Sequence, residues 1–190
     1  MKSNSPESST EDAQLARAAV EDSEAFAELY RRNVARIYRY FLAHTGNTHD
    51  AEDLTSQTFM AALESIRSYR GAGSFAAWIM GIAVKKRAGF FRSRRFEEPL
   101  NEAEQVSTAE LTPDGAVHQK FLTDQILRAL RQISPDRAEA LILCFFGGLN
   151  IREASRVLGK SETALRMSIS RGLNDLRTRT PLALETKNER

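Results

Sequence analysis

A stretch that starts apolar and ends strongly basic, residues 73–95, limits most what this chain can fold into. Ser74 follows a glycine-containing turn and can cap a helix. Three large apolar side chains then recur at about helical spacing: Trp78, Ile82 and Phe90. The second half carries cations and no carboxylate: Lys85, Lys86, Arg87, Arg92, Arg94 and Arg95. The stretch is therefore either a core helix with a solvated basic end or a helix that faces an anion such as nucleic acid.

The rest of the chain shows the same helical periodicity and no strand signal, because it lacks an Asn-Gly hairpin turn and sustained apolar–polar alternation. We expect an all-α fold of two small helical domains joined by a flexible acidic linker. Asp22, Thr48 and Ser134 are candidate helix caps. Helices are expected over 13–20, 24–44, 49–67, 74–95, 117–133, 135–146, 151–158 and 162–177.

Each expected helix has an apolar face that predicts how it packs. The residues expected on these faces are Phe26, Leu29, Tyr30, Ile37 and Phe41; Leu54, Phe59, Leu63 and Ile66; Val117, Phe121, Ile126, Leu130 and Ile133; Ala138, Leu141, Ile142 and Phe145; and Leu165, Ile169, Leu173 and Leu176.

The composition changes after residue 95, where carboxylates appear with no Lys or Arg before Lys120. Pro99 and Pro113 interrupt any helix there, which is typical of a linker. The predicted organisation is a disordered lead-in (1–11), a first domain (12–95), an acidic linker (96–114), a second domain (115–180) and a C-terminal tail (181–190).

The last two expected helices, 151–158 and 162–177, have the pattern of a helix-turn-helix. A glycine at the turn and the capping residue Ser161 separate a short helix from a longer basic one. The exposed face of the second helix mixes cations with small polar groups that can contact phosphates and base edges. A helical hairpin unrelated to DNA has the same hydrophobic pattern, so this alternative stays open.

Bulk properties exclude several classes of protein. The net charge of the 190 residues is only +2, so affinity for nucleic acid has to come from local clusters of cations. The single Cys144 excludes an internal disulfide, and His44, His49 and His118 lack metal-ligand spacing. No nucleotide-binding glycine loop or catalytic triad is found, so we expect no enzyme activity, metal or cofactor. The chain has no transmembrane stretch or signal peptide and is most simply cytoplasmic, without membrane insertion of its own.

Three motifs, in the same order, resemble those of the extracytoplasmic-function (ECF) sigma factors of bacterial RNA polymerase. The first, D-A-E-D-L-T-S-Q-T-F at 50–59, is similar to the family's D-A-E-D-L-T-Q-E-T-F. The second, G-S-F-A-A-W-I at 73–79, is similar to G-S-F-R-A-W-L, and the third is the helix-turn-helix at 149–177. The resemblance covers most of residues 24–177.

The resemblance implies a site for each partner. Docking on core RNA polymerase, through its β′ and β subunits, would use Asp50, Glu52, Asp53, Leu54, Gln57 and Phe59. The −10 element of promoter DNA would be opened and held by the cations of 85–95. The −35 element would be read by Ser161, Thr163, Arg166, Met167, Ser170 and Arg171. The acidic linker would thread toward the RNA exit path, and an anti-sigma factor would cover these surfaces.

The sequence departs from the family at several positions. Many relatives carry R-N-L-A-L-D-H where residues 84–90 read V-K-K-R-A-G-F, which affects the expected reading of −10 bases. Lys160 and Met167-Ser168 replace more usual residues of the helix-turn-helix. Two other functions are compatible with the pattern. One is a stand-alone helix-turn-helix regulator, and the other is a degenerate sigma factor that only sequesters an anti-sigma factor.

Overall fold

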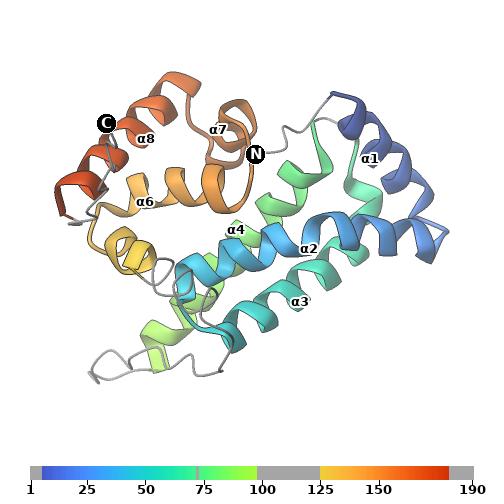
Figure 1. The fold of residues 1–190 in the computed structure, drawn as a ribbon. Helices are drawn as coiled ribbons and strands as arrows, with labels where there is room; N and C mark the ends of the chain where they lie inside the picture. Colours follow the sequence, from blue (N-terminus) through green and yellow to red (C-terminus); the bar gives the residue numbers. More distant parts are fainter. Residues whose placement is uncertain (1–5, 72, 98–124, 180–190) are drawn as a thin grey trace, which may run out of the picture.

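The computed structural model describes residues 6–71, 73–97 and 125–179, and all regular structure in these ranges is helical (Figure 1). The expectation of an all-α fold is therefore confirmed. The first unit, residues 6–97, contains α1 (Pro6–Ala18), α2 (Ser23–Thr45), α3 (Thr48–Ser65), η1 (Ile66–Ser68) and α4 (Phe75–Glu97). The second unit, residues 125–179, contains a helical turn at 125–130, α6 (Pro135–Leu141), the π-helix η2 (Ile142–Phe146), α7 (Ile151–Leu158) and α8 (Glu162–Arg179). No helix within these residues is long and apolar enough to cross a membrane.

Local capping decides where the helices of the first unit begin. The side chain of Asp22 accepts a hydrogen bond from the backbone N–H of Glu24 at 2.9 Å, so this predicted start is confirmed. The prediction of Thr48 as a cap is wrong. Asn47 is extended, with φ −123°, and its side chain accepts from the N–H of Asp50, whereas Thr48 is already the first helical residue.

The predicted lead-in at 1–11 is wrong in part, because α1 begins at Pro6. Proline is tolerated at the first helical position, where its missing N–H has no partner to lose. Arg32 of α2 holds the middle of α1, since its Nη1 lies 3.2 Å from a carboxylate oxygen of Glu11 and 3.1 Å from one of Asp12. Residues 1–5 lie outside the described part of the chain, as do most of the predicted linker and the positions Val117 and Phe121.

Two residues predicted on buried faces of the first unit are exposed. Leu63 is 50% exposed and Tyr30 is 42% exposed. The buried face of α3 also contains small residues, which let α3 approach α2 closely: Ala51, Thr55, Thr58 and Ala62. This face is centred about 110° of helix rotation away from Leu63, at 100° per residue. Leu54, Phe59 and Ile66 are buried as predicted, so the predicted face of this segment is confirmed except at Leu63.

The second unit departs from its predicted faces at the π-helix. The N–H of Gly147 donates to the carbonyl of Ile142, five residues earlier, at 2.9 Å. The wider turn rotates Phe145 outward, where it is 55% exposed, so its predicted place in the core is wrong. Leu173 is also exposed (47%), while Leu165 is fully buried as predicted.

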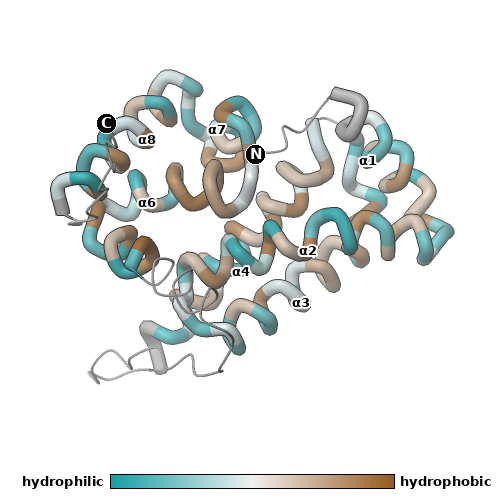
Figure 2. The backbone as a smooth tube through the Cα atoms, in the orientation of Figure 1, coloured by the Kyte–Doolittle hydropathy of each residue, from teal (hydrophilic) through white to brown (hydrophobic). Residues whose placement is uncertain are grey.

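The two units share one continuous hydrophobic core. Buried residues from both belong to the same cluster: η2 packs on α2, and α7 packs on α4. In Figure 2 the hydrophobic segment that continues α6 lies beside α2. Met80 of α4 and Leu143 of η2 are both fully buried. The methyl group of Met80 lies next to Gly147, so close that a side chain on Gly147 would not fit. The structure is thus a closed arrangement, in which η2 and α7 pack on the first unit.

We expect the substitution Gly147→Ala to destabilise this arrangement. A Cβ atom at residue 147 would lie 2.9 Å from Cε of Met80 and 2.7 Å from the carbonyl oxygen of Leu143. The backbone there has φ −74°, which alanine adopts freely, so the contacts alone cause the effect. Overpacking of this kind costs about 1–3 kcal/mol in the free energy of unfolding, measured by urea denaturation.

Gly81→Ala is the matched control, because nothing lies within 4 Å of its added Cβ. It should stabilise α4 by about 0.5–1 kcal/mol, as expected for glycine replaced in a helix interior. A Gly147→Ala protein as stable as the wild type would contradict the close packing of Met80 on η2.

Candidate nucleic-acid and protein interface

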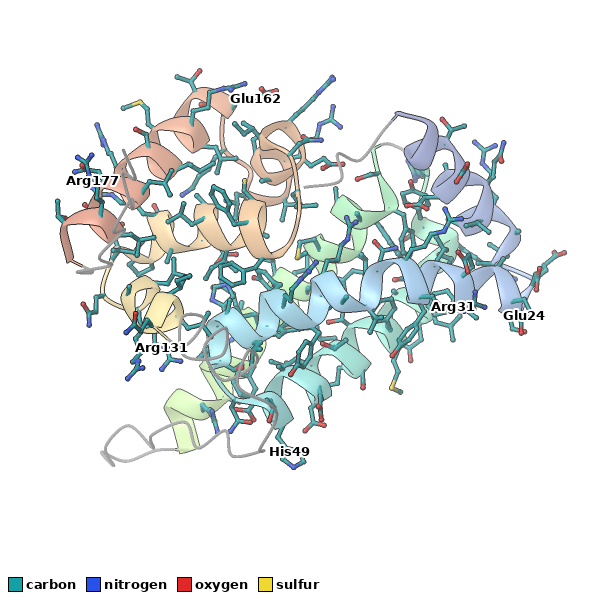
Figure 3. All side chains as sticks on the ribbon, in the orientation of Figure 1. Glu24, Arg31, His49, Arg131, Glu162 and Arg177 are labelled. Atoms are coloured by element: carbon teal, nitrogen blue, oxygen red, sulfur yellow. The ribbon has the colours of Figure 1, made fainter. Side chains whose placement is uncertain are left out.

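The turn and second helix of the helix-turn-helix form where the sequence predicts them. Gly159 has φ 62° and ends α7, and the hydroxyl of Ser161 accepts from the N–H of Ala164 at 3.1 Å, which caps α8. The residues predicted to read the −35 element are all exposed: Ser161, Thr163, Arg166, Met167, Ser170 and Arg171. Figure 3 shows Glu162 and Arg177, near the two ends of α8, on the outer side of this helix. The predicted reading face is thus one continuous exposed strip.

The second unit holds α8 rigidly from behind. A Cβ on Gly172 would lie 2.9 Å from Cδ1 of Leu141, so α8 and α6 pack at close distance. Arg137 of α6 and Asp175 of α8 form an ion pair at 2.5 Å. The exposed strip is therefore presented by a helix that is fixed on its buried side.

The cations of α4 do not form one free surface. Lys85 and Arg92 are exposed and Lys86 is half-buried, whereas two other cations are bound to carboxylates. Arg94 lies 3.1 Å from Asp50 of α3 and stacks over the Phe90 ring at 5.0 Å. Arg87 lies 2.6 Å from Glu139 of the second unit. The side chain of Arg95 lies outside the described part of the structure.

A cavity of about 510 Å³ opens between α3 and α4. Its lining combines apolar side chains, an amide and two ammonium groups: Leu54, Gln57, Ile82, Lys85, Lys86, Gly89, Phe90 and Ser93. Apolar side chains can pack against an aromatic ring, and the two ammonium groups can bind a negative charge that the same ligand carries. Lys85 and Gly89, two of the positions that depart from the family pattern, both line this cavity.

The residues predicted to dock on polymerase divide into two groups. Glu52, Asp53 and Gln57 are exposed on α3, and Asp50 is half-buried and paired with Arg94. Leu54 and Phe59 are only 3% and 4% exposed, so neither offers its side chain to a partner in this structure. The expected apolar anchor at Leu54 is therefore not on the surface.

Sequence reasoning missed an exposed apolar patch that lies near these acidic residues. Met60 is 64% exposed, and Leu63 and Tyr30 are also on the surface. The ring of Tyr30 packs edge-on against Phe59, with centroids 4.6 Å apart, so buried Phe59 supports the patch from below. Met60 and Leu63 are visible in the sequence as large apolar residues, but only the structure shows that they lie outside the buried face of α3.

Sequence reasoning also missed a buried polar cluster between the units. Glu139 of α6 is 7% exposed. The hydroxyl of Tyr40 donates to its Oε1 at 3.0 Å, while its Oε2 lies 2.6 Å from Nη1 of Arg87 and 3.2 Å from Nε2 of His44. Only one feature of the sequence indicated this cluster: Glu139 is the single carboxylate in the otherwise apolar run 138–146. We call these four residues the Glu139 cluster.

The Glu139 cluster fixes the charge state of His44. Nη1 of Arg87 lies 3.2 Å from Nδ1 of His44 and can only donate, so Nδ1 is an unprotonated acceptor and the proton is on Nε2, facing Glu139. Burial lowers the pKa of His44, an effect that Arg87 reinforces and Glu139 opposes. Burial alone would raise the pKa of Glu139, but the groups around it lower that pKa instead.

A second polar contact joins the units where α4 and α7 begin. The hydroxyl of Ser74 accepts from the N–H of Ala77 at 3.2 Å, which confirms Ser74 as the cap of α4. The same hydroxyl donates to Oε1 of Glu153, whose Oε2 accepts from the N–H of Asn150 in the capping box of α7. One serine–glutamate bond therefore links the caps of two helices. No metal-binding group of side chains was found within the described ranges.

Comparison with protein families assigns each unit separately. The sigma-70 region 2 model matches residues 29–97, and the sigma-70 region 4 model matches residues 123–176. The first range covers α2 to α4, and the second covers the helix-turn-helix.

Individual relatives match across both units. The chain is 34% identical over 153 residues to the ECF RNA polymerase sigma factor BldN of Streptomyces coelicolor, a match that covers 79% of this chain and 58% of that relative. The chain thus spans less than two thirds of the length of BldN. It is 30% identical to the RNA polymerase sigma factor CarQ of Myxococcus xanthus, over 81% of this chain and 88% of CarQ. The fold is similar to that of RpoE of Bartonella quintana, solved with the anti-sigma factor NepR, with a TM-score of 0.65 at 22% identity, covering 80% and 94% of the two chains.

We expect acid to weaken the packing of the two units through His44. The unfolded chain takes up a proton as the pH falls through about 6.5, whereas folded His44, whose pKa is lowered, stays neutral. Stability that is present above pH 6.5 is therefore lost below it. The loss is at most about 1.4 kcal/mol per pH unit in the free energy of unfolding, measured by urea denaturation between pH 7.5 and 5.5.

His44→Gln is the control, since glutamine can accept from Arg87 and donate to Glu139 without titrating. Its free energy of unfolding should change less over this interval. Parallel pH profiles for the two proteins would show that His44 is not held neutral.

Proposed function

Because the chain belongs to the ECF group of the sigma-70 family, we propose that it binds core RNA polymerase and directs promoter-specific transcription initiation. The observation that carries this proposal is that each of the two matched regions contains a helix with exposed cations, α8 in the second unit and α4 in the first. Its mechanism is non-covalent, with binding energy used to place polymerase and to hold opened DNA, and it uses no cofactor. The proposed domains are 12–95 and 115–180, which contain most of the matched ranges.

In this proposal α8 enters the major groove at the −35 element. Arg166 and Arg171 bind phosphates or guanine edges, and Ser170 reaches a phosphate or base edge. The exposure of the whole strip and the rigid packing of α8 on α6 support this role. Arg166 is already within 3.4 Å of Glu162, a contact on the surface that DNA phosphates can replace.

The −10 element is assigned to α4 and to the cavity beside it. The cavity of about 510 Å³ is large enough for a base flipped out of the helix, with Phe90 and Ile82 against the ring. Lys85 and Lys86 at the rim are placed to bind the flanking phosphates. Lys85 and Gly89, which differ from the usual family residues, would then shape which base this cavity accepts.

Polymerase is proposed to dock on α3. The exposed carboxylates of Glu52 and Asp53 supply the electrostatic rim, and Met60 and Leu63 supply the apolar contact first expected from Leu54. Asp50, Leu54, Gln57 and Phe59 complete the motif, with Leu54 and Phe59 acting from below the surface. The proposed partners are the β′ and β subunits of core polymerase, with β′ at this surface.

Control by an anti-sigma factor is also proposed. RpoE of Bartonella quintana, which has a similar fold, was solved with the anti-sigma factor NepR. The exposed apolar residues of both units, including Phe145 and Leu63, offer a partner of this kind the surface it needs. We place the protein in the cytoplasm, where core polymerase acts.

We expect Asp53→Arg to weaken binding to purified core RNA polymerase about tenfold or more, because reversing a rim charge puts like charges together. The measurement is a titration of labelled protein with core enzyme. Glu21→Arg is the matched control, since it makes the same charge change at an exposed position outside α3. Binding that is absent in the wild type, or unchanged by Asp53→Arg, would favour a stand-alone DNA-binding regulator.

We expect Arg171→Ala to lower run-off transcription from a promoter that needs its −35 element, while binding to core enzyme stays intact. One bidentate contact to a base contributes about 1–3 kcal/mol. Arg131→Ala is the control, because Arg131 is exposed on the second unit away from α8 (Figure 3). An unchanged promoter preference would contradict the assigned face of α8. Purified protein that yields no specific transcript would indicate a factor that only sequesters its partner.

A further inference from the structure

The Glu139 cluster places a carboxylate of the second unit on a cation of the proposed −10 helix. Arg87 of α4 is bound by Glu139 at 2.6 Å, and its Nη1 also lies 3.2 Å from His44. A phosphate would need the same guanidinium, since carboxylates and phosphates bind arginine in the same way. In the closed arrangement Arg87 is therefore occupied by an anion from its own chain.

The closed arrangement is also too short for a promoter. The −10 and −35 elements lie about 25 base pairs apart, which is about 85 Å along B-form DNA. A compact chain of 190 residues has a radius of gyration of about 16 Å, and α4 and α8 belong to units that share one core. Both helices cannot bind their elements at once unless the units separate. The segment 98–124 between them spans about 90 Å when fully extended, so it is long enough to permit this.

We propose that Glu139 is an internal competitor for promoter DNA, which holds Arg87 and keeps the two units closed until an anionic ligand replaces it. This inference rests on the proposed function of α4. The bond between Ser74 and Glu153 acts in the same direction, because it ties the start of α4 to α7. The closed form is thus held at two points along α4, and both carboxylates come from the second unit.

Separation of the units is measured in the full chain by the distance between two spin labels. Ser56 on α3 and Thr178 on α8 are exposed and lie outside the proposed contact residues, so both are replaced by cysteine in a Cys144→Ala background. The parent protein should give one narrow distance distribution. Glu139→Gln should give a broad distribution at longer distances, because Arg87 loses its counter-charge.

Competition is measured by the affinity for a fluorescent single-stranded oligonucleotide of 20 nucleotides and mixed sequence. If about one wild-type chain in ten is open and able to bind, Glu139→Gln, which opens the remaining chains, should lower Kd about tenfold. The slope of log Kd against log salt concentration should increase by the amount that one additional phosphate contact adds, because Arg87 becomes free to bind the oligonucleotide. Asp136→Asn is the matched control: Asp136 lies on the same helix, but its partner Lys160, at 3.1 Å, belongs to the same unit. It makes the same change of net charge and should alter neither readout.

Glu139→Asp separates this effect from a loss of folding and from net charge. It keeps the negative charge but is one methylene shorter, so it cannot contact Tyr40, His44 and Arg87 together, and an intermediate gain in affinity is expected. An unchanged distance distribution in both Glu139 variants, or separation without a gain in affinity, overturns the proposal. Failure of every variant and the wild type to bind the oligonucleotide contradicts the proposed function of α4, whereas equal binding by all of them contradicts only the role of Glu139.

Discussion

The closed structure depends on a buried pair of opposite charges, Arg87 and Glu139, at the junction of its two units. Burying such a pair costs nearly as much in lost hydration as it gains in attraction, so its net contribution is small. Removing one partner is different, because it leaves a bare charge inside the protein at a cost of about 3–5 kcal/mol. The pair therefore specifies how the units fit together more than it stabilises them. Within the described residues, Nε of Arg87, Nε2 of His44 and Oε2 of Glu139 have no hydrogen-bond partner of good geometry, so the 2.6 Å contact between Arg87 and Glu139 is a contact of charges without a well-directed hydrogen bond.

The two surfaces that we propose for nucleic acid differ as a result. The strip on α8 is open to solvent, and among the residues that the structure describes Arg166 is the strip cation with a salt-bridge partner, Glu162. On α4, Arg87 and Arg94 are each bound to a carboxylate from another element, and the first of these carboxylates comes from the other unit. Asp50, predicted as a polymerase contact, and Arg94, predicted as a DNA contact, are partners of each other. The surfaces that we propose for polymerase and for DNA are thus joined by one ion pair of the first unit.

The sequence predicted what is determined locally. The bounds of α7, the start of α8 and the caps Asp22, Ser74 and Ser161 were all predicted, because each depends on residues a few positions apart. On α3 only Leu63 was assigned wrongly, because large side chains were taken as the centre of the buried face, whereas small ones such as Ala51 and Ala62 form that centre. The Glu139 cluster was not predictable in this way. Its members lie far apart in the chain, and each has an ordinary structural explanation when read alone.

The π-helix η2 determines which changes of chain length this interface tolerates during evolution. It spaces Leu143 and Gly147 so that both face inward while Phe145, between them, faces outward. An ordinary helical turn holds one residue fewer in the same length, so deletion of a single residue here would close the turn to an α-helix and leave the side chains that follow in nearly the same orientation. The same deletion in the α-helix before it would turn every later side chain by about 100°. The junction can therefore lose one residue of length more easily than α6 can, whereas the outward position of Phe145 depends on the extra residue.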